Sequence, residues 1–356
     1  MSAKKTILYV VEDAKSAQFR YRVKNVMEAL ENSNEWQVEW VLKSNLSTVD
    51  FSGISLVVIL RQTGKDGVVP DFIEKAHKNG LKVLFDLDDL IFDYKDLPIL
   101  MKGTNSKNVA YWAGYVWGIR RIAKKVDGFI TTNEFLAEKL KRSFEKPIGV
   151  IRNSLNKEQI EKSGKIVEKK SPRAGVGSKF LVGYFSGSPT HAKDFAMVEP
   201  GLLKFLKSHD NVRLNVVGYM RFSKKMQEMI DTGRVEVVPP VEYLNLQELI
   251  SKVDINIAPL VLNDFTNCKS ELKFFEAAIV NTATIASPSY AFKKVISDGE
   301  NGFLAEPSEW YSKLEYVYNN PKEVQKVAEN AKKTALDKYY GDKFIEEIKK
   351  VYEFFG

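Results

Sequence analysis

The sequence predicts an α/β protein with two domains, each built on a parallel, Rossmann-like β-sheet. Short apolar runs alternate with stretches of helical periodicity twice along the chain, which is the pattern of consecutive βα units. A polar segment, residues 157–179, separates the two series and contains few large apolar residues. The chain has 356 residues, enough for two domains of ordinary size. We therefore expect one domain over residues 1–156, a linker over 157–179 and a second domain over 180–340.

Six apolar runs in the first half are interpreted as strands. They lie at residues 6–11, 37–42, 55–60, 82–86, 128–131 and 148–152. Helices are expected between most of them. For example, Phe19, Val23, Val26 or Met27, and Leu30 recur at helical spacing and predict one buried face.

The second half repeats this organisation and then becomes helical. Its expected strands lie at residues 180–185, 212–217, 235–238, 254–259, 282–286 and 302–305. Helices are predicted over residues 310–319, 322–339 and 343–355, with Pro321 suited to a helix start. Residues 341–356 are expected to form a final helix that packs on the first domain.

Composition excludes several classes of protein. Apolar residues make up 44% of the chain and charged residues 28%, and no apolar run approaches the eighteen or so residues of a spanning helix. The N-terminus leads directly into a strand without a signal-peptide core, so we expect a cytoplasmic protein. One cysteine and three scattered histidines have no metal-ligand spacing, so we expect no metal site.

The formal net charge is +7, from 53 basic and 46 acidic residues. A lysine-rich solvated surface explains such a surplus, and so does contact with an anionic ligand or a membrane surface. Nucleic acid is not expected as a partner, because none of its usual recognition motifs is present.

Residues 263–287 hold the most informative group of charges. They follow an apolar run, and a helix is expected to begin near Lys269. Lys269, Lys273 and Glu276 would then lie at i, i+4 and i+7, on one face of that helix. Lysines and free N–H groups suit phosphates, and a carboxylate suits sugar hydroxyls, so the pattern predicts a nucleoside-diphosphate site.

A second candidate lies at the start of the second domain, where residues 183–194 connect a strand to a helix. Gly187 allows a close approach of ligand and main chain, and Ser186 and Ser188 add hydroxyl groups. The alternative is an ordinary βα turn with Asp194 as the helix N-cap. The ligand-binding interpretation is favoured because this loop and the charged helix would open at the same edge of one sheet.

The first domain has an acidic run, residues 85–93, after its fourth strand. Asp86 and Asp88 form a DxD pattern, which can hold a divalent cation. Alternatively, Asp88 or Asp89 caps a short helix. We favour a third interpretation, in which these acids line an acceptor site and orient or deprotonate a hydroxyl.

Basic residues follow two other strands of the first domain. Arg20 and Arg22 come after the first strand, and Arg61 after the third, so all three are predicted at one sheet edge with Asp86 as acceptor-binding residues. Glu12 and the neighbouring Asp13 suggest a receiver domain. Arg61 stands where the phosphorylated aspartate of such a domain would be, so we reject that interpretation.

Residues 111–125 combine aromatic side chains with a basic end. They could lie on a membrane surface. We favour a helix that covers the sheet with Trp112, Tyr115, Val116 and Ile119 buried.

The run Phe275-Glu276-Ala277-Ala278, followed by Ile285-Ala286-Ser287, resembles the donor-nucleotide motif of GT-B glycosyltransferases, in particular family four. The resemblance spans most of the chain and is distant in the first half. It implies two Rossmann-like domains that face a cleft, with the acceptor on the first and a nucleotide-sugar donor on the second. It also implies that Glu276 accepts the ribose hydroxyls and that residues 183–194 bind the diphosphate.

The sequence departs from the family pattern at two positions. Tyr184 replaces an arginine, so His191 and Lys193 are expected to supply the missing charge. Cys268 replaces the glutamate that contacts the donor sugar in the family, and Lys269, Ser270 or Glu271 is expected to take over.

These observations predict a metal-independent glycosyltransferase, retaining by resemblance, with Asp88, Asp89 and Lys273 as catalytic residues. The expected donor is a nucleotide-sugar, which is a co-substrate, and no cofactor is expected. The expected acceptor is a glycan or a lipid-linked glycan of the bacterial surface, reached in the cytoplasm or at the inner face of the membrane. A nucleotide-sugar epimerase and a non-catalytic binding subunit remain as alternatives. A dinucleotide oxidoreductase is disfavoured because no glycine triplet follows either first strand.

Overall fold

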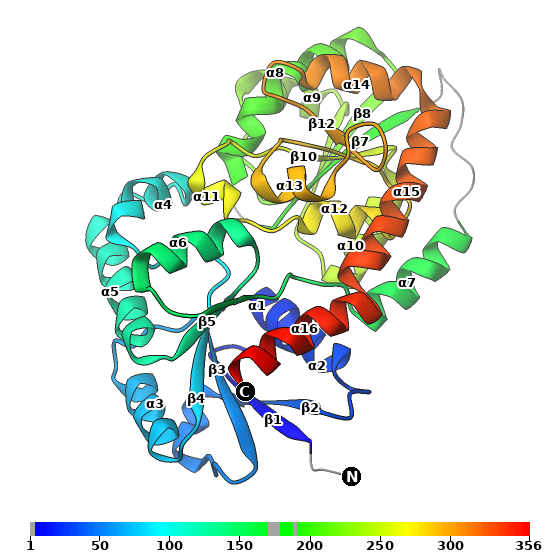
Figure 1. The fold of residues 1–356 in the computed structure, drawn as a ribbon. Helices are drawn as coiled ribbons and strands as arrows, with labels where there is room; N and C mark the ends of the chain where they lie inside the picture. The colour runs from blue at the N-terminus through cyan, green and yellow to red at the C-terminus, as the bar shows by residue number, and fades with distance from the viewer. Residues whose placement is uncertain (1–3, 170–178, 188–190) are drawn as a thin grey trace. The chain divides into compact units, whose positions relative to one another are not determined.

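The computed structural model describes residues 4–169, 179–187 and 191–356. The chain divides into two compact units. Unit 1 comprises Met1–Asn156, Asn267–Ser270 and Tyr339–Gly356, and unit 2 comprises Lys157–Thr266 and Glu271–Lys338. Each unit contains a six-stranded parallel sheet with helices on both faces (Figure 1). The predicted fold class is therefore confirmed.

The sheet of unit 1 has the strand order β2-β1-β3-β4-β5-β6. Its strands are β1 (Lys5–Val11), β2 (Trp36–Leu42), β3 (Ile54–Leu60), β4 (Lys82–Asp86), β5 (Gly128–Thr131) and β6 (Ile148–Val150). The central strands are almost wholly apolar because both faces of a parallel sheet are covered by helices. All six lie within two residues of the bounds expected from the sequence.

The helices of unit 1 connect these strands. They are α1 (Ala17–Phe19), the π-helix η1 (Arg20–Lys24), α2 (Asn25–Ala29), the 3₁₀-helices η2 (Lys43–Thr48) and η3 (Tyr94–Asp96), α3 (Val68–Lys78), α4 (Leu97–Gly103), α5 (Val109–Lys125) and α6 (Glu134–Phe144). In α5, Val116 and Ile119 are buried as expected, whereas Trp112 and Tyr115 are only half-buried.

The last helix, α16 (Asp342–Phe355), belongs to unit 1. Its buried residues Phe344, Ile348, Tyr352 and Phe355 join the same core as the apolar residues of β1 and β3. The Tyr352 hydroxyl is also 2.7 Å from the hydroxyl of Tyr9 on β1. The end of the chain thus completes the core of the domain that the beginning of the chain forms.

The sheet of unit 2 has the strand order β12-β11-β10-β7-β8-β9. Its strands are β7 (Phe180–Ser186), β8 (Val212–Gly218), β9 (Val235–Val238), β10 (Ile255–Ala258), β11 (Thr284–Ala286) and β12 (Phe303–Leu304). Numbered within the unit, this is the order 6-5-4-1-2-3 of a dinucleotide-binding Rossmann sheet.

The helices of unit 2 are α7 (Lys157–Glu168), α8 (Ala192–Ser208), α9 (Lys224–Asp231), α10 (Tyr243–Lys252), α11 (Asp264–Asn267), α12 (Leu272–Ala278), α13 (Tyr290–Val295), α14 (Trp310–Asn319) and α15 (Pro321–Tyr339). The helix α7 occupies half of the predicted linker. It packs on α10, where the Lys162 ammonium donates to Asn245 Oδ1 at 3.0 Å and pairs with Glu248 at 3.2 Å. The low apolar content of these residues does not predict the helix, because polar contacts hold it on α10.

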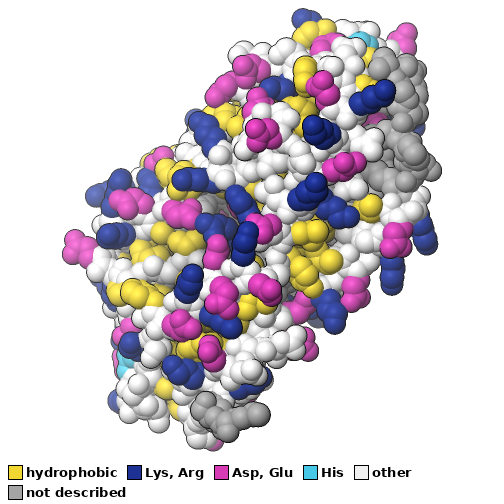
Figure 2. Space-filling model, turned by 45° about the vertical axis from the view of Figure 1, so that its right-hand side comes forward, with side chains coloured by type: hydrophobic (Ala, Val, Ile, Leu, Met, Phe, Trp, Pro, Cys, Tyr) yellow, Lys and Arg dark blue, Asp and Glu magenta, His cyan; other side chains and the backbone are white. Residues whose placement is uncertain are grey.

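Basic and acidic side chains are interspersed over the face shown in Figure 2. The surplus of positive charge therefore forms no continuous basic patch on that face. In the part of the chain that the structure describes, none of the helices is long and apolar enough to cross a bilayer.

Candidate functional site

The strand order of unit 2 places a topological switch point between β7 and β10. The chain leaves β7 for β8 on one side, and later returns to β10 on the other side. Loops that leave neighbouring strands in opposite directions create a crevice at the carboxyl edge of the sheet, where ligands bind in such folds. The predicted donor-binding loop follows β7, and the predicted donor-binding helix α12 follows β10. Both therefore begin at this edge.

An aspartate at the start of α8 holds the loop that follows β10. Asp194, in the first turn of α8, accepts a hydrogen bond from the main-chain N–H of Val261 at 2.9 Å. Its other oxygen lies 2.9 Å from His191 Nδ1. The N-cap of α8 is His191, so the interpretation of Asp194 as an N-cap is wrong. Asp194 instead joins the start of α8 to the loop that follows β10.

Ser186 and Gly187 lie at the end of β7, and Lys193 is exposed on the first turn of α8. The Ser186 hydroxyl is largely buried and donates a long hydrogen bond, 3.4 Å, to the carbonyl of Tyr219. Ser188 lies outside the described residues.

Gly218 explains how close the two strands come at this edge. Its φ is +110°, and a Cβ atom there would lie 1.8 Å from the Ser186 carbonyl oxygen. Only glycine fits this position. Sequence reasoning missed Gly218, although a glycine that closes an apolar strand is a visible signal.

The helix that carries Glu276 begins later than expected. It starts at Leu272, so Lys269 and Ser270 precede it and the predicted i, i+4, i+7 face does not include Lys269. Glu276 itself is buried, 9% exposed, which excludes a freely solvated glutamate. Lys273 is half-buried.

Asn256 fixes α12 on the sheet. This β10 residue is buried, and its amide donates to the carbonyl of Lys273 and to Thr284 Oγ1, each at 3.0 Å. A buried polar side chain with two such bonds holds a helix in one position. Asn256 was also missed by sequence reasoning, because a lone asparagine in a strand does not reveal its partners.

Tyr184, which replaces the family arginine, points into the core and not toward a ligand. It is fully buried beside Phe195, with ring centroids 5.3 Å apart. Burial raises the pKa of its hydroxyl well above the usual range, and the charge of Asp194 adds to the rise. Tyr184 therefore supplies no charge to a phosphate.

Lys269 and Ser270 pack with unit 1, within the segment Asn267–Ser270. The Asn133 amide donates to the carbonyl of Cys268 at 3.0 Å. The Asn153 amide donates to the Ser270 hydroxyl at 2.9 Å. The predicted donor-binding residues are thus divided between the units: Lys269 and Ser270 are held by unit 1, and the other described ones lie in unit 2.

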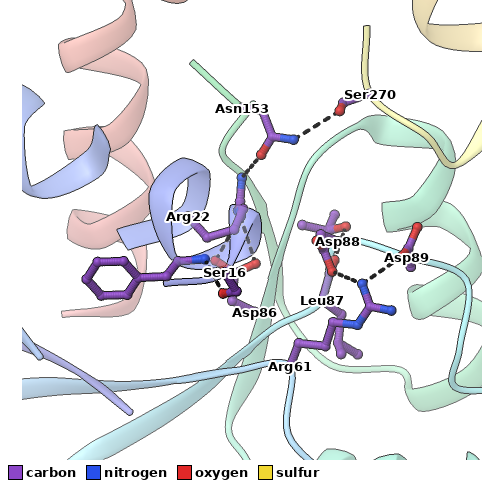
Figure 3. A network of polar contacts seen from close by, with 11 residues as sticks. Ser16, Arg22, Arg61, Asp86, Leu87, Asp88, Asp89, Asn153 and Ser270 are labelled. Atoms are coloured by element: carbon purple, nitrogen blue, oxygen red, sulfur yellow. Dashed lines mark hydrogen bonds and ion pairs between the residues drawn. The ribbon is translucent and has the colours of Figure 1, made fainter. Parts of the chain in front are cut away.

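The acidic run of unit 1 is paired with Arg61. Its Nη1 lies 3.0 Å from Asp88 Oδ1 and 2.6 Å from Asp89 Oδ2 (Figure 3). Neither aspartate is a helix N-cap in the structure; the helix that follows, η3, is capped by Asp93. Burial raises the pKa of Asp89, and the charges of Arg61 and Lys269 oppose that rise. The structure therefore brings together three of the predicted residues, Arg61, Asp88 and Asp89, with Lys269 nearby.

Arg61 also has an unusual backbone. Its φ is +32°, and its N–H donates to the carbonyl of Asp86 at 3.0 Å. A residue with a large side chain rarely adopts this conformation, and such residues concentrate at functional sites.

Arg22 and Asp86 form a buried ion pair. Their side chains are 1% and 0% exposed, and Arg22 Nε lies 3.0 and 3.1 Å from the two carboxylate oxygens. Burial raises the pKa of Asp86 to about 6, against the opposing effect of Arg22. Because these side chains face each other and not solvent, neither can contact an acceptor directly in this conformation. The pair ties the end of β4, which carries Asp86, to the end of β6, because the Arg22 guanidinium also donates to the carbonyl of Ile151.

Arg22 belongs to the π-helix η1, a type of helix that is frequent at functional sites. The neighbouring Arg20 is half-buried and stacks on Tyr21, with its guanidinium carbon 4.5 Å from the ring centroid. Acceptor binding by Arg20 therefore stays a prediction.

Both carboxylates of the DxD pattern are engaged by arginines. Asp86 pairs with Arg22, and Asp88 pairs with Arg61. Among the described residues no group of three His, Cys, Asp or Glu side chains is placed to hold a metal ion.

One protein-family model matches part of the sequence. Residues 183–320 match the family model for glycosyl transferases group 1. None of the curated proteins matches the sequence. The matched range begins in β7 and contains Ser186, Gly187, Lys273 and Glu276.

Solved structures match over nearly the whole chain. HepE from Anabaena, solved with UDP and glucose, is 13% identical, with 98% of this chain and 99% of that chain covered and a TM-score of 0.63. Sucrose-phosphate synthase from Thermosynechococcus elongatus is 12% identical, with 98% of each chain covered and a TM-score of 0.66. A glycosyltransferase from Rickettsia africae is 15% identical, with 99% and 98% covered and a TM-score of 0.65.

These likenesses confirm the predicted GT-B fold. The match to the family model assigns the group 1 glycosyltransferase type to residues 183–320.

Proposed function

We propose that this protein transfers a sugar from a nucleotide-sugar to a glycan or lipid-linked acceptor. One observation carries the proposal: in a domain that matches the group 1 family, a buried glutamate, Glu276, lies on the helix that begins at the switch-point edge of a Rossmann sheet. A carboxylate so placed suits the hydroxyls of a ribose.

The donor's diphosphate would bind beside the end of β7 and the start of α8. Gly187 leaves room for a close approach, and Lys193, Lys273 and His191 would offset its charge, with Ser186 as a further polar contact. Negative charge grows on the diphosphate as the glycosidic bond breaks. Prepositioned cations and N–H groups stabilise that charge without reorganising. Lys269 and Ser270 would contact the donor sugar.

The acceptor would bind unit 1, where Asp88 and Asp89 orient its attacking hydroxyl and Arg61 holds the two carboxylates in place. Arg20 would contact the acceptor, and the buried Arg22–Asp86 pair would support this surface from beneath. We further propose that no metal is needed, because arginines already neutralise Asp86 and Asp88.

The proposed setting is the synthesis of a bacterial surface polysaccharide in the cytoplasm, with peripheral contact at the inner face of the membrane. The exposed aromatic residues Tyr111 and Trp117 on α5, 53% and 47% exposed, suit such a contact. Retention of configuration at the transferred carbon is part of the proposal and rests on the family resemblance.

Two experiments in sequence test this function. A thermal-shift screen of nucleotides and nucleotide-sugars should find one nucleoside diphosphate that raises the melting temperature. UDP is the first to try, since HepE was solved with UDP and with UDP-glucose. Product analysis with the matching nucleotide-sugar should then show sugar on an acceptor. Conversion of the sugar without any acceptor would indicate an epimerase, and binding without turnover over a broad acceptor panel would indicate a non-catalytic subunit.

A further inference from the structure

A groove lies along one side of α8 in unit 2. It has a volume of about 1060 Å³, the size of a pocket for a small organic molecule. One wall is α8, which contributes residues from Ala196 to Ser208 at the spacing of a single helix face. The opposite wall is the start of α9 and the loop before it, from Arg221 to Lys225. The groove is therefore formed by unit 2 alone.

The lengths and side chains of the two helices explain the hollow. The helix α8 has 17 residues, whereas its neighbour α9 has eight and is too short to cover all of α8 (Figure 1). Ala196 and Pro200 contribute only small side chains to the lining. Leu203 and Phe222 add apolar surface, and Phe222 is fixed against Phe195 with ring centroids 5.6 Å apart. The groove thus has an apolar floor.

The charged groups of the lining are mostly basic. Five basic side chains, all exposed, line the groove: Lys204, Lys207, Arg221, Lys224 and Lys225. One carboxylate, that of Glu199, also lines it. Five positive charges against one negative charge create a local potential that attracts an anion.

Most of these cations have no protein partner. The Lys204 ammonium lies over the ring of Tyr311, 3.9 Å from its centroid. In the part of the chain that the structure describes, the other four basic side chains form no hydrogen bond or ion pair. By contrast, Lys313 on α14 pairs with Asp298 at 3.0 Å. The cations of the groove are therefore available to a ligand.

We propose that this groove binds the headgroups of anionic phospholipids at a bilayer surface. Lysine and arginine side chains bind phosphate oxygens, and each lysine near an anionic bilayer adds to the attraction. The apolar floor suits the glycerol and first methylene groups of a lipid, which neither a free phosphate ion nor an acidic peptide provides. The inference goes beyond the proposed function, which assigns membrane contact to α5 of unit 1.

Flotation of the whole chain with vesicles tests the groove. One set of vesicles contains phosphatidylcholine alone, and the other contains phosphatidylcholine and phosphatidylglycerol in equal amounts. We expect the protein to bind the second set and not the first. The double variant Lys207→Ala/Lys224→Ala removes one charge from each wall. It should weaken this binding by about thirtyfold, since each lysine near an anionic surface contributes about fivefold.

Two further variants separate the groove from general surface charge. Ala196→Glu places a carboxylate in the groove and removes no lysine, and it should weaken vesicle binding by about fivefold. Lys322→Ala/Lys326→Ala is the matched control, because both lysines are exposed on α15 of the same unit and lie outside the groove lining. The control should bind vesicles as the wild type does. Melting temperatures equal to that of the wild type verify that each variant is folded.

Equal losses in the groove variants and the control would overturn the inference, and so would a wild type that does not bind the phosphatidylglycerol vesicles. Binding of soluble polyglutamate as tight as that of the vesicles would overturn the choice of a lipid. A wild type that transfers sugar without binding vesicles would leave the proposed function standing. A wild type that transfers no sugar and binds no nucleoside diphosphate would overturn the proposed function itself.

Discussion

At the carboxyl ends of their strands the two units differ in chemistry. Unit 1 has ion pairs there: Arg22 with Asp86, and Arg61 with Asp88 and Asp89. Unit 2 has hydroxyl and main-chain groups around Ser186, and a buried glutamate on α12. Charges that neutralise each other fix geometry, whereas oriented polar groups at a switch point suit an incoming anion. The ion pairs of unit 1 therefore fix the positions of its charged side chains without a ligand. Unit 2 instead has polar groups suited to the anionic donor that we propose.

The largest effect is expected when the buried pair of unit 1 is broken. Arg22→Ala leaves Asp86 buried without its partner, which should cost about 3–5 kcal/mol of unfolding free energy. Denaturant titration measures the loss. The control is Arg142→Ala, which breaks an exposed pair with Glu138 and should cost about 0.3–0.5 kcal/mol. Equal losses in the two variants would show that the unit 1 pair does not fix geometry.

The next effect concerns the close approach of β7 and β8 in unit 2. Gly218→Ala places a Cβ against the Ser186 carbonyl and should cost about 2–4 kcal/mol. It should also weaken nucleotide binding, because Ser186 at the end of β7 must shift. Gly233→Ala is the matched control: its φ is +70° and nothing lies near its Cβ, so only about 1 kcal/mol is expected. Thermal melts with and without UDP compare them. Indistinguishable variants would contradict the packing described for this edge.

A smaller effect should appear in the dependence of stability on pH. The pKa of Asp86 rises from its ordinary 3.8 to about 6 on folding, so the folded protein binds this proton at a higher pH than the unfolded chain does. The contribution of Asp86 to stability therefore falls as the pH rises from about 4 to about 6. Asp86→Asn removes this titration. The melting temperature of the wild type relative to that of the variant should decline over this range; parallel curves would refute the shift.

Most strands could be predicted from the sequence because a buried parallel strand is a continuous apolar run, as in Ile54–Leu60. The functional role of Glu276 was suggested by a local pattern, and its burial agrees with that pattern. The start of α12 could not be predicted, because the segment Asn267–Ser270 is held by Asn133, more than 130 residues earlier. Such contacts join residues that no local periodicity connects.

The same reason explains the other differences. Asp194, Asp88 and Asp89 look like helix caps when only their neighbours in the chain are considered. Their partners are Val261 and Arg61, which other loops supply. Residues 157–168 look like a linker because they lack large apolar residues, yet a polar helix forms where α10 offers it hydrogen bonds.

The central claim is that a nucleoside diphosphate binds unit 2 with its ribose on Glu276. Calorimetric titration of UDP into the wild type, Glu276→Ala and Glu199→Ala tests it most directly, since Glu199 is an equally buried glutamate of the same unit, on α8. We predict that Glu276→Ala weakens UDP binding by about tenfold or more, the cost of a lost charged hydrogen-bond partner, with an unliganded melting temperature close to that of the wild type. Glu199→Ala should bind as the wild type does. Unchanged UDP affinity in Glu276→Ala would contradict the account.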